Sequence, residues 1–469
     1  MIGTTMEAGI DAIVDTQNGG KCMCHAWFSF HKTVRGYRHE KEGIPCQDSS
    51  VSYAGKNYHI AVVADGHGDP ACARSQLGAS YVVEITEKCL TDFATALSCG
   101  TMPFKTERQR LECVQQLKNT IVSKWHNAVH RHLQENEITH DELQQAGDYT
   151  RLYENGERLE HLYGTTLIAA LMTQTYLLLL QQGDGRCDVF YSDGNIDQPI
   201  PWDTRCSGNI TTSMCDEDAA NRFRSILLDV KKLGIIACYL GSDGVEDSYY
   251  ENELSQQGTH QFYMDLSCML DKVGKESFDS YLNEMLPKFS ASGSTDDVSV
   301  AGIIDLDGIR PHIQEYMRQI NKYNRKEKLK KEIVQIDHKL VSMERKRTFL
   351  IEKSKELKLA LKVTEDRLRE TKARCRKVIE DKRNKSTKIK GVTVQIVGKY
   401  RIELKSLDQS KSIREERLKL AQDLKEFKQA NQACQKATEE TELYENQFQQ
   451  LKSYLTELEK RFQNYDEGE

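Results

Sequence analysis

The sequence predicts an α+β domain followed by an all-α coiled-coil arm. The first observation is compositional: the last proline is Pro311, and the glycines beyond it are Gly391, Gly398 and Gly468. The second is that apolar runs of strand length alternate with helical stretches before this point. After it, apolar residues recur in steps of three and four, which is the period of a coiled coil.

Charge divides the chain at the same place. The 469 residues carry a formal net charge of −6, but residues 310–469 hold 40 basic and 27 acidic residues, a net of +13. Residues 1–309 hold 25 basic and 44 acidic residues, a net of −19. We therefore expect an N-terminal tail at 1–24, a domain at 25–309 and an arm at 310–469 with a break at about 384–400.

Composition also excludes several classes of protein. With 38% hydrophobic residues, the chain is too apolar for a disordered protein, and no run approaches the roughly 18 apolar residues that a membrane-spanning helix needs. The N-terminus has no basic stretch before an apolar core, so a secretory signal is not expected. The 14 cysteines are spread singly along the chain, which indicates a reducing, cytoplasmic location.

Several apolar runs of the first domain end at an aspartate. The predicted elements are a strand at 59–65, helices at 71–90 and 108–135, two strands around Gly183-Asp184-Gly185, a strand at 235–247, a helical segment near 262–290 and a strand at 294–305. Asp65, Asp184, Asp243 and Asp296 each lie at the edge of such a strand. Close carboxylates repel one another unless a cation is present, and Mg²⁺ and Mn²⁺ prefer oxygen ligands. The pattern favours a divalent metal site, although a single Asp-Gly pair can also mark a hairpin turn.

Five short motifs occur in an order that resembles a known family. They are Asp65-Gly66-His67-Gly68, Gly164-Thr165-Thr166-Leu167, Gly183-Asp184-Gly185-Arg186, Ser242-Asp243-Gly244-Val245-Glu246-Asp247 and Ser294-Thr295-Asp296-Asp297-Val298-Ser299. This order resembles the type 2C metal-dependent Ser/Thr protein phosphatases. Their bacterial-type branch is similar at Gly36-Tyr37-Arg38-His39, Pro45-Cys46-Gln47-Asp48 and Asn209-Ile210-Thr211-Thr212. The resemblance covers about 36–305 and implies a β-sandwich of two antiparallel sheets flanked by helices.

The resemblance also implies a set of metal ligands. Asp65 would bridge two metal ions, and Gly66 would lend its backbone carbonyl to one of them. Asp243 and Asp296 would complete the other, while Asp184 matches a third, weaker metal position. The implied cofactors are therefore two Mn²⁺ or Mg²⁺ ions, with a place for a third.

The implied reaction is hydrolysis of phosphoserine or phosphothreonine in a phosphoprotein. A hydroxide that bridges the metals would attack phosphorus in line, and the ions would neutralise the phosphoryl oxygens. Asp65 would hold that pair of ions, and His67 matches the family's general acid for the leaving alkoxide. Asp48 matches a residue that holds metal-bound waters. No phosphoenzyme is implied, so no cysteine is needed as a nucleophile.

The sequence departs from the family pattern at the phosphate-binding position. Members closest to the eukaryotic pattern place an arginine shortly before a Glu-Asp pair, where it grips the substrate phosphate. This sequence has Gln47-Asp48, and the position four before Gln47 is Gly43. We expect His39 to bind the phosphate, ahead of Arg38 or Arg35.

The arm contains two apolar repeats around the break. The first extends from about 312 to 384 and the second from about 401, and the glycines and β-branched residues between them cannot easily continue a helix. Four residues interrupt the first repeat without changing its register: Arg347, Ser354, Thr364 and Thr371. We favour an antiparallel hairpin because residues 310–390 carry a net +15 and residues 391–469 a net −2. The alternative is a parallel dimer whose coil passes through the break.

Two functional hypotheses follow. The leading one is an active phosphatase whose coiled coil recruits a protein partner or regulates the enzyme. The competing one is a weak or inactive phosphatase-fold scaffold that works through its coiled coil, and the missing arginine motivates it. Nucleic acid is a less favoured partner, because the basic clusters of the arm lack a base-reading motif and are typical of a solvated face. No membrane contact is expected, and the substrate and oligomeric state stay open.

Overall fold

The structure is a computed structural model that describes residues 27–206, 210–249, 255–385, 394–397, 401–404 and 411–464. The predicted N-terminal tail, Asn209 and much of the predicted break lie outside these residues. The chain divides into two units, Met1–Asn321 and Lys322–Glu469. Among the described helices, none is long and apolar enough to cross a membrane.

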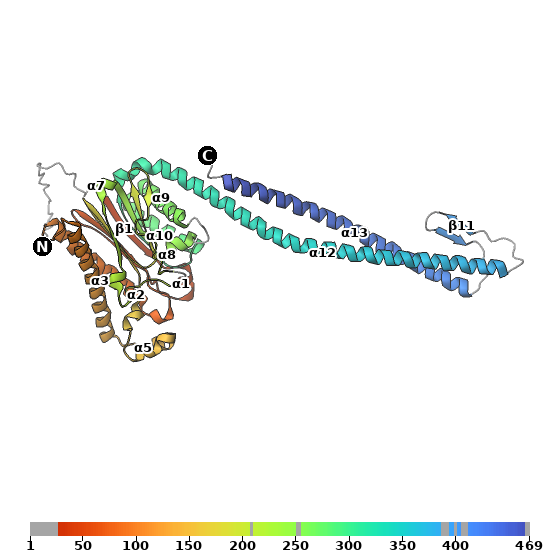
Figure 1. Ribbon diagram of the computed structural model, residues 1–469, viewed down its shortest axis with the longest axis horizontal. Helices are drawn as coiled ribbons and strands as arrows, with labels where there is room; N and C mark the ends of the chain where they lie inside the picture. The colour runs from red at the N-terminus through yellow and green to blue at the C-terminus, as the bar shows by residue number, and fades with distance from the viewer. Residues whose placement is uncertain are drawn as a thin grey trace, which may run out of the picture. The chain divides into compact units, whose positions relative to one another are not determined.

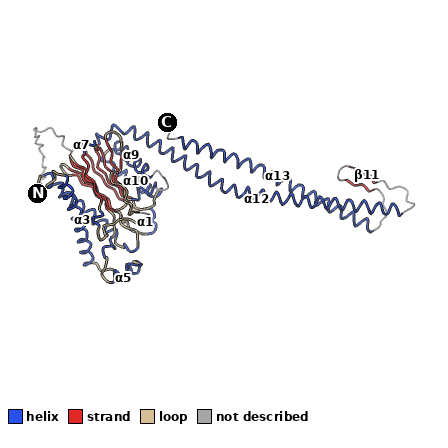
Figure 2. Tube along the Cα trace, viewed as in Figure 1, coloured by secondary structure: helices blue, strands red, loops and turns tan. Residues whose placement is uncertain are grey.

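The described strands of the first unit form two five-stranded antiparallel sheets (Figure 2). They are β1 (Trp27–Val34), β2 (Ser49–Ala54), β3 (Tyr58–Ala64), β4 (Leu167–Thr173), β5 (Tyr176–Gln182), β6 (Arg186–Tyr191), β7 (Ile196–Asp197), β8 (Arg224–Asp229), β9 (Ile235–Gly241) and β10 (Val298–Asp305). One sheet has the order β1-β10-β9-β6-β7 and the other β2-β3-β4-β5-β8. Alternate residues such as Val63, Leu179, Leu240 and Ile303 pack between the sheets. The predicted β-sandwich is confirmed.

Helices cover the outer faces of both sheets (Figure 1). Residues of α2 (Ser75–Ser98) and α3 (Glu107–Glu135) pack against one sheet, and residues of α9 (Ser255–Val273) and α10 (Lys275–Ser292) against the other. The predicted segment near 262–290 is therefore two helices, which separate at Gly274 with a left-handed φ of 78°. The shorter helices are α1 (Tyr37–Glu42), η1 (Pro70–Cys72), α4 (His140–Gln145), η2 (Gly147–Tyr149), α5 (Thr150–Glu154), η3 (Leu159–Tyr163), α6 (Ala219–Arg222), α7 (Val230–Leu233), α8 (Asp243–Glu246), η4 (Asp247–Tyr249), α11 (Leu306–Ile309) and η5 (Arg310–His312).

Both outer faces of the sandwich are apolar, which explains the continuous apolar runs in the sequence. In β4, Ile168 and Ala170 face the other sheet, whereas Leu167 and Ala169 face α2 and α3. A strand that is buried on both faces reads as an uninterrupted apolar run rather than an alternating one. The buried sheet positions the turns at its ends, where the predicted site residues lie.

Two long helices and a small sheet follow. They are α12 (Ile313–Lys385), β11 (Val394–Val397), β12 (Arg401–Leu404) and α13 (Lys411–Gln463). Strand β11 lies in the predicted break and pairs with β12 in antiparallel register. The predicted start of the second repeat at about 401 is therefore wrong, because Arg401–Leu404 is a strand and α13 begins at Lys411. The first turns of α12 belong to the first unit, because Ile313 and Tyr316 are buried in the core that also contains Phe278.

Within the second unit, α12 and α13 contact each other in antiparallel order. Glu332 accepts a 2.7 Å hydrogen bond from Tyr454, and Thr371 donates one of 2.7 Å to Asp423. Residue numbers thus rise along α12 as they fall along α13. These contacts lie within one chain, whereas the parallel alternative requires a second chain.

Candidate active site

One end of the sandwich gathers the turns that carry the predicted site residues. In the sheet that contains β2, β3 and β4, Ala64 lies opposite Ser49, and just beyond β3 Gly66 forms a bridge with Thr165. In the sheet that contains β6, β9 and β10, Gly241 lies opposite both Arg186 and Val300. In an antiparallel pair, one strand ends where its neighbour begins. The turns after β3 and β9 therefore lie close to the turns that precede β4, β6 and β10.

These turns line one cavity of about 1300 Å³. The sequence-predicted residues along it are Asp65, Gly66, His67, Asp184, Asp243, Asp296 and His39. Asp48 is not part of the lining, but it is buried beside these residues with 8% of its surface exposed. The structure therefore brings together residues that are up to 257 positions apart in the chain.

The carboxylates at the centre of the cavity have strongly raised pKa values. Burial raises the pKa of Asp65 well above its usual range, and the charges of Asp243 and Asp48 raise it further. Burial also raises the pKa of Asp243 to about 7, although its side-chain hydrogen bond with Asp65 acts in the opposite direction. Two negatively charged carboxylates that lie close together with little water around them repel each other. This arrangement costs free energy unless a proton or a cation neutralises one of the charges.

Asp48 gives a separate test of whether a metal fits here. Burial raises its pKa, and Asp297 and Asp243 add to that shift. Its Oδ2 atom is buried and has no hydrogen-bond partner among the described residues. A buried carboxylate oxygen without a protein partner can accept hydrogen bonds from the waters of a hydrated ion. The donor set is oxygen throughout, so it fits Mg²⁺ or Mn²⁺.

Asp184 lies in the turn between β5 and β6, whose backbone is fixed from several sides. Gly183 has a left-handed φ of 103°, which favours glycine. Its N–H donates to Thr212 Oγ1 at 3.0 Å, and Arg224 donates to its carbonyl at 2.6 Å. Burial raises the pKa of Asp184 as well. The turn thus holds a further carboxylate at the cavity.

His39 lies between two aspartates rather than at the open surface. Its Nε2 is 3.2 Å from Asp296 Oδ1, and its Nδ1 is 3.0 Å from Asp297 Oδ1. The second is an ion-pair distance only, since Nδ1 makes no hydrogen bond with suitable geometry. The His39 side chain is 5% exposed, whereas that of Arg38 is 50% exposed and lies 3.1 Å from Asp296 Oδ2. The Arg38 side chain is therefore the more accessible of the two, and phosphate binding by His39 stays a prediction.

Asp297 is a positioning residue to which the sequence analysis gave no role. It accepts a 2.6 Å hydrogen bond from the backbone N–H of Gly36 and another of 2.6 Å from that of Gln47. It thereby joins the loops that precede α1 and β2 to the turn that carries Asp296. The adjacent pair Asp296-Asp297 is visible in the sequence. The sequence alone does not show that Asp297 holds the loops while Asp296 faces the cavity.

His67 is held at the cavity by both its backbone and its ring. Its N–H donates to Gly164 O at 3.0 Å, and its Nε2 lies 2.8 Å from Ser213 Oγ. Burial, together with the nearby His161, lowers its pKa to about 4. The imidazole is therefore neutral near pH 7 in the absence of substrate. Ser213 was missed because no sequence motif connects it with His67.

Comparison with known proteins supports the resemblance. A family model described as Protein phosphatase 2C matches residues 35–287. A search of curated proteins finds no match. The family match confirms the predicted recognition and, with it, the predicted class of enzyme, a protein-serine/threonine phosphatase.

The solved structures that match this chain include the following three proteins. The serine/threonine phosphatase Stp1 from Staphylococcus aureus is 16% identical, over 63% of this chain and 99% of its own, with a TM-score of 0.35. PppA from Pseudomonas aeruginosa is 14% identical, over 60% and 97%, with a TM-score of 0.36. The catalytic domain of the phosphatase PstP, in complex with two manganese ions, is 16% identical, over 60% and 98%, with a TM-score of 0.31. The family model matches more than half of the residues of this chain, and the chain therefore belongs to the protein phosphatase 2C family.

Proposed function

We propose that this protein is an active metal-dependent phosphatase that hydrolyses phosphoserine or phosphothreonine in a protein substrate. The observation that supports the proposal is the group of partly buried carboxylates with raised pKa values at one cavity. A scaffold that only binds phosphoproteins has no need for such a costly group.

Two Mn²⁺ or Mg²⁺ ions would be held by Asp65, the Gly66 carbonyl, Asp243 and Asp296, with Asp184 available to a third. When bound, such ions activate water as a nucleophile and neutralise charge on the phosphoryl group. The ligands come from the ends of buried strands, so the core holds them in place without the ions. Asp48 would accept hydrogen bonds from waters at the edge of the site.

Two residues of the chain would then act on the substrate, and a third would position a metal ligand. Arg38, on the exposed side of the cavity, would bind the phosphate, and His39 would orient Asp296 from behind. His67 would carry the proton for the leaving oxygen. Because burial lowers its pKa to about 4, His67 must gain that proton when the negatively charged phosphate enters.

The test is hydrolysis of a phosphothreonine peptide by the full chain with Mn²⁺ or with EDTA. Asp243→Asn removes a proposed ligand, and Asp92→Asn is the matched control because Asp92 is exposed on α2. Turnover that requires Mn²⁺ and is lost in Asp243→Asn alone supports the proposal. Metal binding without turnover would overturn it and leave the scaffold hypothesis.

We also propose that the arm recruits a protein partner or regulates the enzyme. Apolar side chains on α12 stay exposed although α13 lies alongside: Phe349 is 60% exposed, Leu359 66% and Val363 58%. Exposed apolar surface of this kind often marks an interface. The comparison to make is turnover by the full chain against a chain that ends after Asn321. Higher turnover in the shorter chain would identify the arm as an inhibitor, whereas loss of a substrate protein but not of a peptide would identify it as a recruiter.

A further inference from the structure

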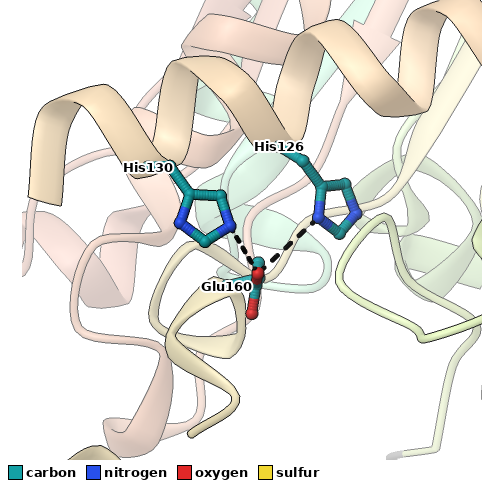
Figure 3. A group of neighbouring side chains, drawn as sticks. All are labelled: His126, His130 and Glu160. Carbon is teal, nitrogen blue, oxygen red and sulfur yellow. Dashed lines mark ion pairs between the residues drawn. The ribbon is translucent and has the colours of Figure 1, made fainter. Parts of the chain in front are cut away.

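Two histidines of α3 and a glutamate of η3 point toward one another at the edge of the active-site cavity (Figure 3). Glu160 Oε1 lies 2.8 Å from His130 Nε2 and 3.7 Å from His126 Nδ1. The three atoms all lie within 4.8 Å of one another. His126 and Glu160 also line the cavity.

The two histidines are held by a well-packed helix. They are four residues apart, so they lie on one face of α3, about one turn from each other. Their neighbours Trp125 and Val129 are fully buried, and the Trp125 indole donates a 3.0 Å hydrogen bond to Gly78 O. The backbone that carries both imidazoles is therefore fixed, while the rings themselves remain accessible to solvent.

The glutamate is held against the same helix. Tyr163, at the end of η3, is fully buried, and its hydroxyl lies 2.6 Å from His132 Nδ1 on α3. Arg74 donates a further 2.9 Å hydrogen bond to this hydroxyl. The relative positions of η3 and α3 are therefore set without any contribution from Glu160.

We propose that His126, His130 and Glu160 form a binding site for a borderline transition-metal ion such as Zn²⁺. Two imidazoles and one carboxylate are ligands that suit Zn²⁺ and leave a fourth position for water. Bonds of about 2.0–2.1 Å in a tetrahedron place ligand atoms about 3.3 Å apart, and the observed 2.8 and 3.7 Å lie on either side of that value. The site differs in chemistry from the aspartate cluster, whose donors are all oxygen.

The glutamate is ionised, as both a metal site and an ion pair with a histidine require. Its interaction with His126 is the main cause that lowers the pKa of Glu160, to about 2. The carboxylate is thus ionised and available as a ligand. The simpler alternative is an ion pair between Glu160 and a protonated histidine, and metal binding distinguishes the two.

The test uses the full chain in excess Mg²⁺, which occupies oxygen sites and competes poorly for imidazole. Co²⁺ is titrated in while its visible absorption is recorded, and Zn²⁺ is then added to displace it. We expect one equivalent of Co²⁺ to bind with the intense bands of a low-coordinate site and to be displaced by Zn²⁺. His126→Ala and Glu160→Gln should each weaken binding by more than the roughly 10–100-fold that loss of an outer-shell partner costs.

The matched control is His140→Ala, since His140 is an exposed histidine whose ring contacts Gln144. It should bind Co²⁺ like the wild type. Absence of the bands in the wild type, or bands that survive both substitutions, would overturn the site. The proposal is independent of the phosphatase reaction, because Asp243→Asn should leave this Co²⁺ signal in place.

Discussion

The two units differ in the partners that surround their acidic side chains. In the second unit, Asp423 is 5% exposed, and it accepts a hydrogen bond from Thr371 with Arg367 Nε 3.7 Å away, both on the facing helix. In the first unit, Asp243 faces other aspartates, and its pKa is raised to about 7. A carboxylate with a partner in its own chain fixes how two elements pack. A carboxylate whose neighbours are mainly other carboxylates indicates that a compensating cation comes from outside the chain.

Replacing Asp243 should have the largest effect, with opposite consequences for activity and stability. Asp243→Asn removes a proposed metal ligand, so we expect hydrolysis to fall by roughly 100-fold or more. In EDTA the same change removes repulsion from Asp65, so the melting temperature should stay equal or rise. Thermal unfolding in EDTA and in Mn²⁺ checks this, with Asp92→Asn as control. A lower melting temperature in EDTA would mean that Asp243 is satisfied within the protein.

The pH dependence of the metal-free protein should differ from that of an ordinary acidic protein. The folded-state pKa of Asp243 is raised to about 7, so the folded state holds more protons than the unfolded state between pH 6.5 and 8. Stability in EDTA should therefore fall as pH rises through this range. His67 gives a smaller slope of the opposite sign, because its pKa is lowered in the folded state and the unfolded chain still binds protons at this histidine near pH 6.5. Urea midpoints at the two pH values measure it, and Asp243→Asn should flatten the decline.

Substitutions at Arg38 and His39 should separate substrate binding from metal binding. Arg38→Ala should raise the KM for a phosphopeptide about tenfold, because one exposed charge–phosphate contact is lost. His39→Ala should mainly raise the Mn²⁺ concentration needed for activity, since His39 contacts Asp296. Steady-state kinetics at several Mn²⁺ concentrations distinguishes them. The reverse result would support the sequence-based assignment of the phosphate to His39.

A smaller effect is expected in the arm. Thr371→Val leaves Asp423 without its 2.7 Å hydrogen bond, which should cost about 1 kcal/mol of local stability. Hydrogen exchange of α12 and α13 amides should accelerate near this pair while phosphatase activity is unchanged. Thr348→Val, at an exposed position of α12, is the control. Protection that disappears on dilution would instead indicate that the helices pair between chains.

The sequence predicted the parts of the site that carry short motifs. Asp65, Asp184 and Asp243 each lie within two residues after the end of an apolar strand, so a local pattern was sufficient to predict that they come together at one cavity. Ser213 and Glu160 could not be found in this way, because their roles depend on packing against His67 and α3. Contacts of this kind are set by the whole fold rather than by neighbours in sequence.

The arm shows a similar limit. Thr371 was recognised only as an interruption of the apolar repeat, whereas the structure pairs it with Asp423. A polar residue at a core position gives no sign of its partner until the facing helix is in register. The strand pair β11–β12 was also unforeseen, although its β-branched residues were correctly excluded from a helix.

The start of α12 has a consequence for the modularity of the protein. Composition changes near Gly308, but Ile313 and Tyr316 are buried in the core of the first unit, and the Tyr316 ring lies 5.7 Å from that of Phe190. Burial of an isoleucine side chain such as that of Ile313 contributes about 1.5–3 kcal/mol. A protease that cuts beyond Asn321 should release the arm and leave a folded enzyme, whereas one that cuts at Gly308 should open its core. A gene fusion that exchanged the arm would have to retain these first turns of α12. The segment that must be inherited together with the enzyme therefore extends further than the change in composition suggests.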